Sequence, residues 1–346
     1  MLPEEFFVEY VQWWLPTWFV RCLVRMYMRI QGPLMRSGDV VIRQIETDSA
    51  LRATLPVTTD VETVNEQLYG NDPYFFVNHL GPRLKYSACE YLPGVDSLAA
   101  AETYTIQRYQ DLSGIGGLPA ASRVLELGCG WGSLSLANAE RYPNLLFTSF
   151  SNSPQQIGYI TEQAKQRGLK NLTVLVEDYA VFVQPAKSKV APLGTAPFDA
   201  AIAIETIEHA KNITQLLGAV ALRLKPGAKL FVQSLLHQTA SYLMDSNSWM
   251  GRNFFTGGSI LSLNSYFHLT PPELTLSRAI PVRGTGYSRT LLDWLELMEQ
   301  HRKEFVRRYS HSFYEGFRMF YIASAEAFGA NNGAEFMVGY YVFVKQ

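Results

Sequence analysis

VLELGCGWG, residues 124–132, is an apolar segment that leads directly into a loop with three glycines. Glycines at positions 128, 130 and 132 permit positive φ and a close backbone approach to a nucleotide. The spacing is GxGxG, whereas a dinucleotide fingerprint is GxGxxG. Glu126 precedes the loop, and with no pyrophosphate to bind, it can face the cationic methionine end of S-adenosylmethionine. We therefore expect S-adenosylmethionine as the cofactor; the alternative is a tight strand–helix turn without a ligand.

Outward from this loop, short β-rich runs alternate with helical stretches. The expected strands are Arg123–Leu127, Leu146–Phe150, Leu172–Glu177, Phe198–Ile204 and Lys229–Leu235. The expected helices are Gly132–Glu140, Pro154–Arg167 and Asn212–Leu224, the last one stopped by the Lys225-Pro226-Gly227 sequence. Such alternation is typical of βαβ units and predicts an α/β fold with a doubly wound, Rossmann-like sheet.

The rest of the chain divides around this core. Residues 1–120 read as an N-terminal helical region that contributes to the active site, and residues 121–236 as the cofactor-binding core. Residues 237–335 are expected to form a substrate cap, irregular to about residue 285 and then helical over 289–309 and 313–328. Residues 336–346 predict a final strand that returns to the sheet, and the three prolines in 184–197 indicate a surface loop.

Composition excludes several classes of protein. Hydrophobic residues make up 47% and charged residues 18% of the 346 residues, which is typical of a packed globular protein. The formal net charge of -1 does not indicate the excess of basic residues that is typical of nucleic-acid-binding proteins. Cys22, Cys89 and Cys129 are widely spaced, so we predict neither a disulfide framework nor a metal site, and a cytoplasmic location.

The N-terminus contains an uncharged aromatic run, Tyr10–Val20, followed by Arg21, Arg25 and Arg29. The run is shorter than the roughly 20 residues of a spanning helix. The arginines share one face of a helix because they recur every four residues. The favoured interpretation is an amphipathic helix packed on the domain, and the alternative is an interfacial helix that touches membrane.

Polar side chains follow the second and third expected strands. The second ends without the acid that usually holds the ribose, and offers Asn152 and Gln156 instead. Asp178, beside Tyr179 after the third strand, is placed to accept from an adenine amino group. For Asp178 a helix N-cap is an equally weighted interpretation.

The fourth strand ends in ETIEH, residues 205–209. Ligands of such sheets bind at the carboxyl ends of the strands, so Glu205, Glu208 and His209 are expected to face the methyl group of the cofactor. An alkyl amine is mostly protonated at pH 7 and must lose a proton before methylation. The two acids can bind and orient the ammonium, and His209, with a pKa expected near 7, can take the proton. A helix start with favourable acids explains only one of the three residues.

Several further motifs lie in a characteristic order: LKYSAC (84–89), SNSPQQ, ETIEHAKN, RNFFTGGS (252–259) and FGANNGAEFMVGYYVFVK near the end. With the glycine loop, they make the sequence from about Tyr69 onward resemble the coclaurine N-methyltransferase-like family, a relative of the cyclopropane fatty acid synthases. The resemblance implies a class I S-adenosylmethionine-dependent methyltransferase with a helical cap after the fifth strand.

The resemblance also implies site residues. Tyr86, Ser87, Gly128 and Gly130 would contact the cofactor, and Asn152, Gln156 and Asp178 with Tyr179 would hold ribose and adenine. Glu205, Glu208 and His209 would meet an acceptor amine. The substrate pocket would include Phe255, Tyr287, Tyr321 and His237, the last matching a histidine that cyclopropane synthases use with bicarbonate.

Two departures from the synthases favour a small amine, aromatic or alkaloid-like, as the acceptor. Ala88 stands where their bicarbonate cysteine falls, and Glu205 replaces a glycine. A second carboxylate helps an ammonium and not a neutral alkene. Glu90 departs from the N-methyltransferases, which carry an aromatic there, so the amine is expected to differ from a benzylisoquinoline.

Two other functions stay open. The first is lipid modification, with the N-terminal helix on a bilayer and cyclopropanation or C-methylation of an acyl chain. The second is a binding scaffold without activity, which fits poorly with an intact glycine loop and ETIEH. A homodimer is compatible with the sequence.

Overall fold

The computed structural model describes residues 12–35, 39–58, 72–190 and 197–346. Its strands are β1 (Arg123–Leu127), β2 (Leu146–Ser151), β3 (Leu172–Val176), β4 (Phe198–Ile204), β5 (Leu224–His237), β6 (Tyr242–Leu243), β7 (Ser259–Ser262), β8 (Leu274–Arg283) and β9 (Phe336–Lys345). The helices of the N-terminal part and core are α2 (Thr17–Met35), α3 (Val40–Ser49), α5 (Pro73–Val77), α6 (Leu98–Ser113), α7 (Ser133–Arg141), α8 (Pro154–Gln166), α9 (Tyr179–Phe182) and α10 (Ile213–Ala221). Those after β5 are α11 (Trp249–Asn253), α12 (Ser265–Leu269), α13 (Thr285–Gln300), α14 (Arg302–Arg308) and α15 (His311–Gly329).

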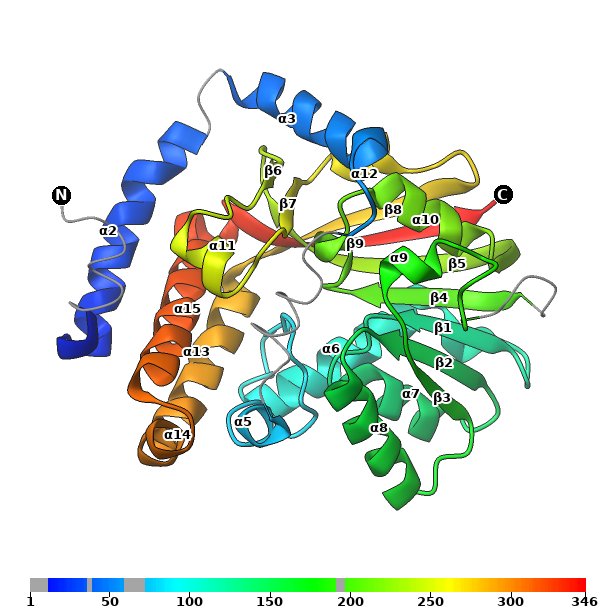
Figure 1. The fold of residues 1–346 in the computed structure, drawn as a ribbon, viewed down its shortest axis with the longest axis horizontal. Coiled ribbons are helices and arrows are strands. Elements are labelled where there is room, and N and C mark those ends of the chain that lie inside the picture. Colours follow the sequence, from blue (N-terminus) through cyan, green and yellow to red (C-terminus); the bar gives the residue numbers. More distant parts are fainter. Residues whose placement is uncertain (1–11, 36–38, 59–71, 191–196) are drawn as a thin grey trace.

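The strands form one mixed sheet with the order β3-β2-β1-β4-β5 at its parallel centre (Figure 1). The order reverses between β1 and β4, and ligands of doubly wound sheets bind at this switch point. The predicted final strand is confirmed: β9 lies antiparallel beside β5, from Lys229 opposite Val344 to His237 opposite Phe336. The expected α/β class is therefore the observed one.

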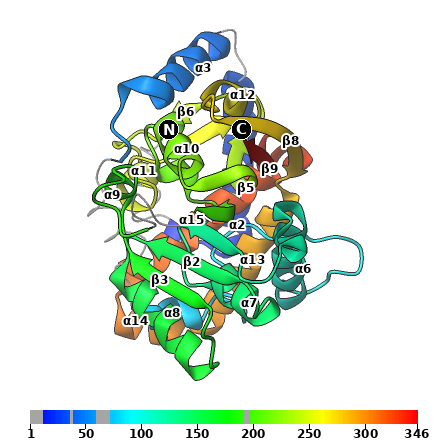
Figure 2. The same ribbon diagram turned by 90° about the vertical axis from the view of Figure 1, so that its right-hand side faces the viewer.

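Alternation along the strands separates two hydrophobic layers. In β1 and β4, Val124, Ala200 and Ile202 join a cluster with residues of α6 and α7. The intervening Leu125 and Ala201 join another with residues of α9 and α10. The sheet is thus covered on both faces, as Figure 2 shows from the side. The first cluster extends from Val20 to Val342, so the four predicted parts of the chain share one core.

The segment 237–285, expected to be irregular, contains β6, α11, β7, α12 and β8. The ten-residue β8 pairs with β9 along its whole length. Most of its side chains are at least partly exposed because it is an edge strand, so its sequence lacks a regular apolar alternation. Pro281 also lies within it, which edge strands tolerate.

Two expected helices have different ends. The helix predicted over 212–224 stops at Ala221, and the Pro226-Gly227 pair lies inside β5, where the register with β4 shifts. The single helix expected over 289–309 is two helices, α13 and α14, divided at His301. No proline or glycine marks that break, so the local sequence does not signal it. The loop expected over 184–197 lies partly outside the described residues.

The N-terminal helix α2 packs on α15 through its arginine face. Arg21 Nε and Arg25 Nε approach the two carboxylate oxygens of Glu326 at 2.6 and 2.9 Å, and this carboxylate is 6% exposed. Trp18 and Met26 of the same helix are exposed. Within the described ranges, no helix is both long enough and apolar enough to cross a membrane.

We expect Glu326→Gln to loosen α2 because the three hydrogen bonds from Arg21 and Arg25 to this nearly buried carboxylate lose its negative charge and one of its two oxygen acceptors. The free energy of unfolding should fall by about 1 kcal/mol, since both arginines remain partly exposed. Trypsin should also cleave faster at Arg21 and Arg25. Urea unfolding and timed proteolysis measure both effects, with the exposed Glu162→Gln as the control; an unchanged cleavage rate would contradict this docking contact.

Candidate functional site

The glycine loop after β1 has the backbone expected of a nucleotide-binding turn. Gly128, Gly130 and Gly132 all have positive φ, at 63°, 51° and 82°. A Cβ at Gly128 would lie 2.1 Å from Thr206 Oγ1, whereas one at Gly130 would have no atom within 4 Å. Gly128 therefore allows contact between β1 and the end of β4, and Gly130 borders open space in which a nucleotide fits.

Glu126 lies beneath this loop and links three elements. Its Oε2 accepts hydrogen bonds from Ser135 Oγ at 2.6 Å and Ser149 Oγ at 3.0 Å. Burial raises the pKa of Glu126 to about 7, and the two serine hydroxyls oppose that rise. A cation in the cavity would favour the ionised form, which fits the expected role beside the methionine end of the cofactor.

A cavity with about 1040 Å³ of space between atoms, partly open to solvent, adjoins the loop. Its lining includes all eight residues predicted to bind the cofactor: Tyr86, Ser87, Gly128, Gly130, Asn152, Gln156, Asp178 and Tyr179. Of the predicted catalytic residues, Glu205 and His209 also line it. The structure thus brings together residues from the segment before α6 and from the ends of β1, β2, β3 and β4.

Two of the predicted adenosine ligands have distinct settings. Gln156 Oε1 accepts from Ser151 Oγ at 2.8 Å, and its buried Nε2 has no hydrogen-bond partner among the described residues. An unpartnered buried donor at a cavity wall fits a polar ligand. Asp178 N-caps α9 through Ala180 N at 2.6 Å while lining the cavity, so its two interpretations are compatible.

Glu205 occupies the first position after β4 in a strained conformation, with φ at +46°. Its Oε1 accepts from Ala88 N at 2.8 Å and from Gln233 Nε2. Burial raises the pKa of this carboxyl, and the charge of Lys85 is the largest effect opposing the rise. The strain is typical of functional sites, and here it directs a carboxylate toward the cavity.

Glu208 and His209 belong to the short 3₁₀ turn Ile207–His209. Burial and the charge of Glu205 raise the pKa of Glu208 to about 8, so it is mainly a neutral acid at pH 7. Glu208 lies behind the cavity wall and is not part of the lining. Burial lowers the pKa of His209 to about 4, which corrects the expected value near 7. His209 is therefore neutral, and its buried Nδ1 has no hydrogen-bond partner in the described part of the chain.

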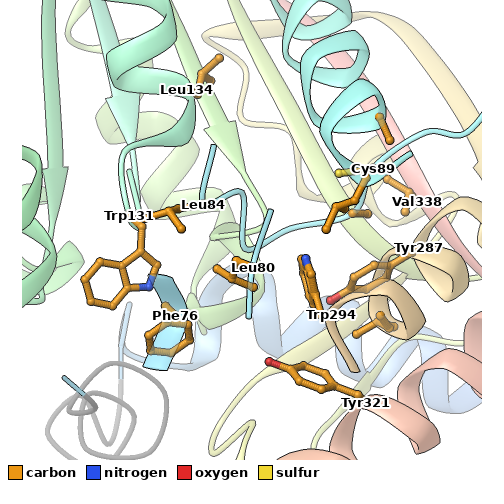
Figure 3. Packing of buried hydrophobic residues seen from close by; sticks show 14 of the residues in the cluster. Phe76, Leu80, Leu84, Cys89, Trp131, Leu134, Tyr287, Trp294, Tyr321 and Val338 are labelled. Atoms are coloured by element: carbon orange, nitrogen blue, oxygen red, sulfur yellow. The ribbon is translucent and has the colours of Figure 1, made fainter. Parts of the chain in front are cut away.

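Aromatic rings from the cap continue the wall beyond Tyr86. Figure 3 shows Tyr287, Trp294 and Tyr321 gathered on one side of Leu80. Trp294 lies 5.3 Å from Tyr86, 6.3 Å from Tyr287 and 5.9 Å from Tyr321, measured between ring centroids. Trp294 packs on Tyr86, which lines the cavity, but none of these three rings is part of the lining. Their contact with a substrate stays a prediction.

The phenol of Tyr321 is oriented by a buried histidine. His79 Nδ1 lies 2.6 Å from the carbonyl oxygen of Phe75, which can only accept, so Nδ1 carries the proton. His79 Nε2 must then accept from Tyr321 Oη, also at 2.6 Å. Burial lowers the pKa of His79 to about 3, which keeps this arrangement at neutral pH.

The other two predicted pocket residues lie further from the cofactor loop. Phe255 packs edge-on against His209, with ring centroids 5.4 Å apart. His237 is fully buried at the end of β5, where Nε2 lies 3.2 Å from Glu335 Oε1 and Nδ1 accepts from Ala240 N. His237 does not line the cavity, and a role for it in substrate binding remains only a prediction.

Sequence reasoning missed several lining residues, among them Lys85, Tyr109, Trp131 and Thr206. Lys85 is the most informative, because its side chain is only 1% exposed. It belongs to LKYSAC, next to the predicted Tyr86, so the motif marked the segment but not this side chain. Tyr109 comes from α6 and carries no local signal.

Comparison with known proteins agrees with this geometry. The model of the family described as mycolic acid cyclopropane synthetase matches residues 57–335. The chain belongs to this family. An (S)-coclaurine N-methyltransferase of Papaver somniferum is 28% identical over 96% of this chain and 95% of its own length. The corresponding enzyme of Thalictrum flavum subsp. glaucum is 26% identical over 94% and 91%.

A solved structure extends the comparison to the fold. The crystal structure of a coclaurine N-methyltransferase bound to N-methylheliamine and SAH has a TM-score of 0.85, with 24% identity over 97% of this chain and 98% of that one. The expected resemblance is confirmed, and the fold is that of the class I S-adenosylmethionine-dependent methyltransferases. When bound, S-adenosylmethionine supplies this family with a methyl group on a positively charged sulfur.

In this family member, Glu90 does not line the cavity. Its Oε1 accepts from Tyr340 Oη at 2.8 Å and lies 3.0 Å from Arg108 Nε. Glu90, which stands where an aromatic residue was expected from the N-methyltransferases, therefore forms an ion pair within the protein. Any effect of Glu90 on the choice of substrate must be indirect.

We expect Gly130→Val to abolish cofactor binding. The added side chain fills the open space over the loop, and the left-handed backbone at this position strains any β-branched residue. Calorimetric titration with S-adenosylhomocysteine measures the loss. The control is Gly158→Val, a solvent-side change on α8 where a Cβ also meets nothing within 4 Å. If both variants bound S-adenosylhomocysteine with comparable affinity, the cofactor site would not lie over this loop.

The raised pKa of Glu208 predicts a dependence of stability on pH. The folded protein holds this proton more tightly than the unfolded chain does. The contribution of protonated Glu208 to the free energy of unfolding is therefore fully present below pH 4.5 and declines as the pH rises to about 8. Glu208→Gln should remove that decline, since a neutral amide can still accept from Leu235 N. Urea unfolding of both proteins at pH 5 and 8.5 tests this, and parallel losses of stability would refute it.

Proposed function

We propose that this chain transfers the methyl group of S-adenosylmethionine to the nitrogen of a small, cationic amine with an aromatic or alkaloid-like framework. The observation that carries this proposal is the buried carboxyl of Glu205 beside the neutral imidazole of His209 at the cavity wall. A carboxylate in such a setting gains from a cationic partner and not from an alkene.

Glu205 supplies the anchor for the ammonium group. Both hydrogen bonds that it receives fall on Oε1, which leaves Oε2 to accept an N–H of the amine. Holding the nitrogen at a fixed place beside the cofactor cavity removes much of the entropic cost of the reaction. The amine must still lose one proton before its lone pair can attack.

His209 is the acceptor for that proton. It lines the cavity and is neutral at physiological pH. Its lowered pKa means that it does not retain the proton, which passes on to solvent. Glu208 behind it presents a buried Oε2 without a described partner and provides further polarity close to the imidazole.

The aromatic residues supply the rest of the pocket. Tyr86, Trp294 and Tyr287 form a continuous group of rings between the cofactor cavity and the cap. Ring faces attract alkylated ammonium groups, so they tolerate the positive charge of an N-methylated product. The names of the N-methyltransferase relatives support the same class of acceptor.

Other aspects of the biology are also proposals. All three cysteines are free, and two are buried, which suits a reducing compartment such as the cytoplasm. Lipid modification, the chemistry in the name of the family, is the alternative that the assay below separates from amine methylation.

The decisive assay uses radiolabelled S-adenosylmethionine with phenethylamines, tryptamines, tetrahydroisoquinolines, alkylamines and phospholipid vesicles. We expect label in a small amine. Glu205→Gln and His209→Ala should each lower kcat by roughly 10²–10⁴, as expected for loss of an orienting or proton-accepting group.

Matched controls are Glu162→Gln and His268→Ala, which change exposed residues of the same types. S-adenosylhomocysteine affinity should stay close to that of the unmodified protein in all four variants. Full activity in both site variants would remove these residues from the mechanism, and label only in lipid would overturn the proposed acceptor.

A further inference from the structure

Lys85 is a buried cation that the proposed chemistry does not yet use. Its Nζ donates to Ser87 Oγ at 2.7 Å and to the carbonyl oxygen of Ala88 at 2.6 Å. The ammonium also lies 5.1 Å from the centroid of the Tyr109 ring. Burying a lysine is costly unless hydrogen bonds and opposite charge compensate it. The carboxyls of Glu102 and Glu205 are both close enough for the charge of Lys85 to lower their pKa values against the effect of burial.

Ala88 connects this ammonium to Glu205. The carbonyl oxygen of Ala88 accepts from Lys85 Nζ and, at 3.3 Å, from Tyr109 Oη. The N–H of the same residue donates to Glu205 Oε1 at 2.8 Å. Lys85 therefore holds in place the residue that orients the carboxylate, and the two side chains bind opposite ends of one amino acid.

The charge of Lys85 also favours the carboxylate form of Glu205. Burial raises the pKa of Glu205, and the nearby charge of Lys85 lowers it. Glu90 of this region is paired with Arg108 at 3.0 Å, and the thiol and phenols around Glu205 are uncharged at pH 7. Burial raises the pKa of the thiol and phenols of Cys89, Tyr109, Tyr287 and Tyr340. Glu208 is largely protonated and His209 is neutral, so Lys85 is the cation that favours ionised Glu205 within the described structure.

We propose that Lys85 is a positioning residue that keeps Glu205 an oriented carboxylate while Glu208 stays a neutral acid. Of the two acids of ETIEH, Glu205 alone is then ionised, and it offers one negative charge to an amine with a single ammonium group. This inference rests on the proposed function and deepens it, because it makes the ionisation of Glu205 depend on a residue that need not touch the substrate.

The ionisation of Glu205 can be measured without substrate. Carbon-13 labelling of the glutamate carboxyls, with Glu205→Gln to identify the signal, gives its titration midpoint in the unmodified protein. We expect an ionised Glu205 at pH 7. In Lys85→Met the midpoint should rise by about 1–3 pH units, the usual effect of removing a close opposite charge. Lys85→Arg keeps the charge and should shift it much less.

Kinetics provide the second readout. Because only ionised Glu205 holds the ammonium, the acidic limb of kcat/KM for the amine should move to higher pH in Lys85→Met. The exposed Lys165→Met should leave the profile unchanged. Lys85→Gln, smaller and polar, replaces the methionine variant if that one fails to fold.

The outcomes separate the two proposals. A protonated Glu205 at pH 7 in the unmodified protein, or an unmoved midpoint without Lys85, overturns the role of Lys85 whether or not an amine is methylated. Absence of amine methylation with an ionised, Lys85-dependent Glu205 overturns the proposed function alone. A loss of activity that is equal at every pH would show a merely structural role for Lys85.

Discussion

The anchoring of the Glu205 carboxylate is the constraint on which the site depends. Residues that are not glycine adopt a left-handed conformation at a cost of about 1–3 kcal/mol, and Glu205 does so immediately after β4. Hydrogen bonds from Ala88 and Gln233 offset that cost. The same carboxylate joins β4, β5 and the segment before α6. The wall of the cavity therefore forms only when these three parts of the chain are assembled.

Buried acidity gives the site its chemical character. Glu126 lies under the glycine loop and Glu208 behind the end of β4, and burial raises the pKa of both. With Glu205 they surround a region where positive charge is favoured. The cofactor of this family and a protonated amine are both cations, so the reaction brings together two groups that would repel each other in an uncharged pocket. The carboxylate that we propose for Glu205 at the cavity wall would lower that repulsion.

We propose that the cap selects the substrate. Its rings come from α13 and α15, which pack against each other, and rings of the α5 region, in the N-terminal part of the chain, lie beside them. The ring centroid of Phe76 lies 5.0 Å from that of Trp131 and 5.2 Å from that of Tyr86. Phe76 therefore connects the cofactor loop to the proposed substrate side. The fixed tautomer of His79 orients the Tyr321 hydroxyl at the far end of this group. The proposed substrate pocket is thus surrounded by aromatic rings, which suits the flat or alkylated amines that we propose as substrates.

The sequence by itself determined the core and the positions of its chemistry. The β1 strand, the GxGxG loop and the ETIEH sequence follow from local rules of strand alternation, glycine conformation and strand-end placement, and the structure has Gly128, Gly130, Glu205 and His209 at one cavity. Local rules failed where long-range packing decides. The edge strand β8 exists because β9 pairs with it, and the break at His301 has no local signal.

Only the tertiary structure decided the ionisation of the site. Burial makes His209 a far weaker base than its type suggests, and it makes Glu208 a neutral acid. The sequence placed Lys85 in a motif, but only the fold brings its charge, and Ala88 beside it, to Glu205, more than a hundred residues away along the chain. Such effects depend on which groups are removed from water together, and a linear pattern of residues does not contain that information.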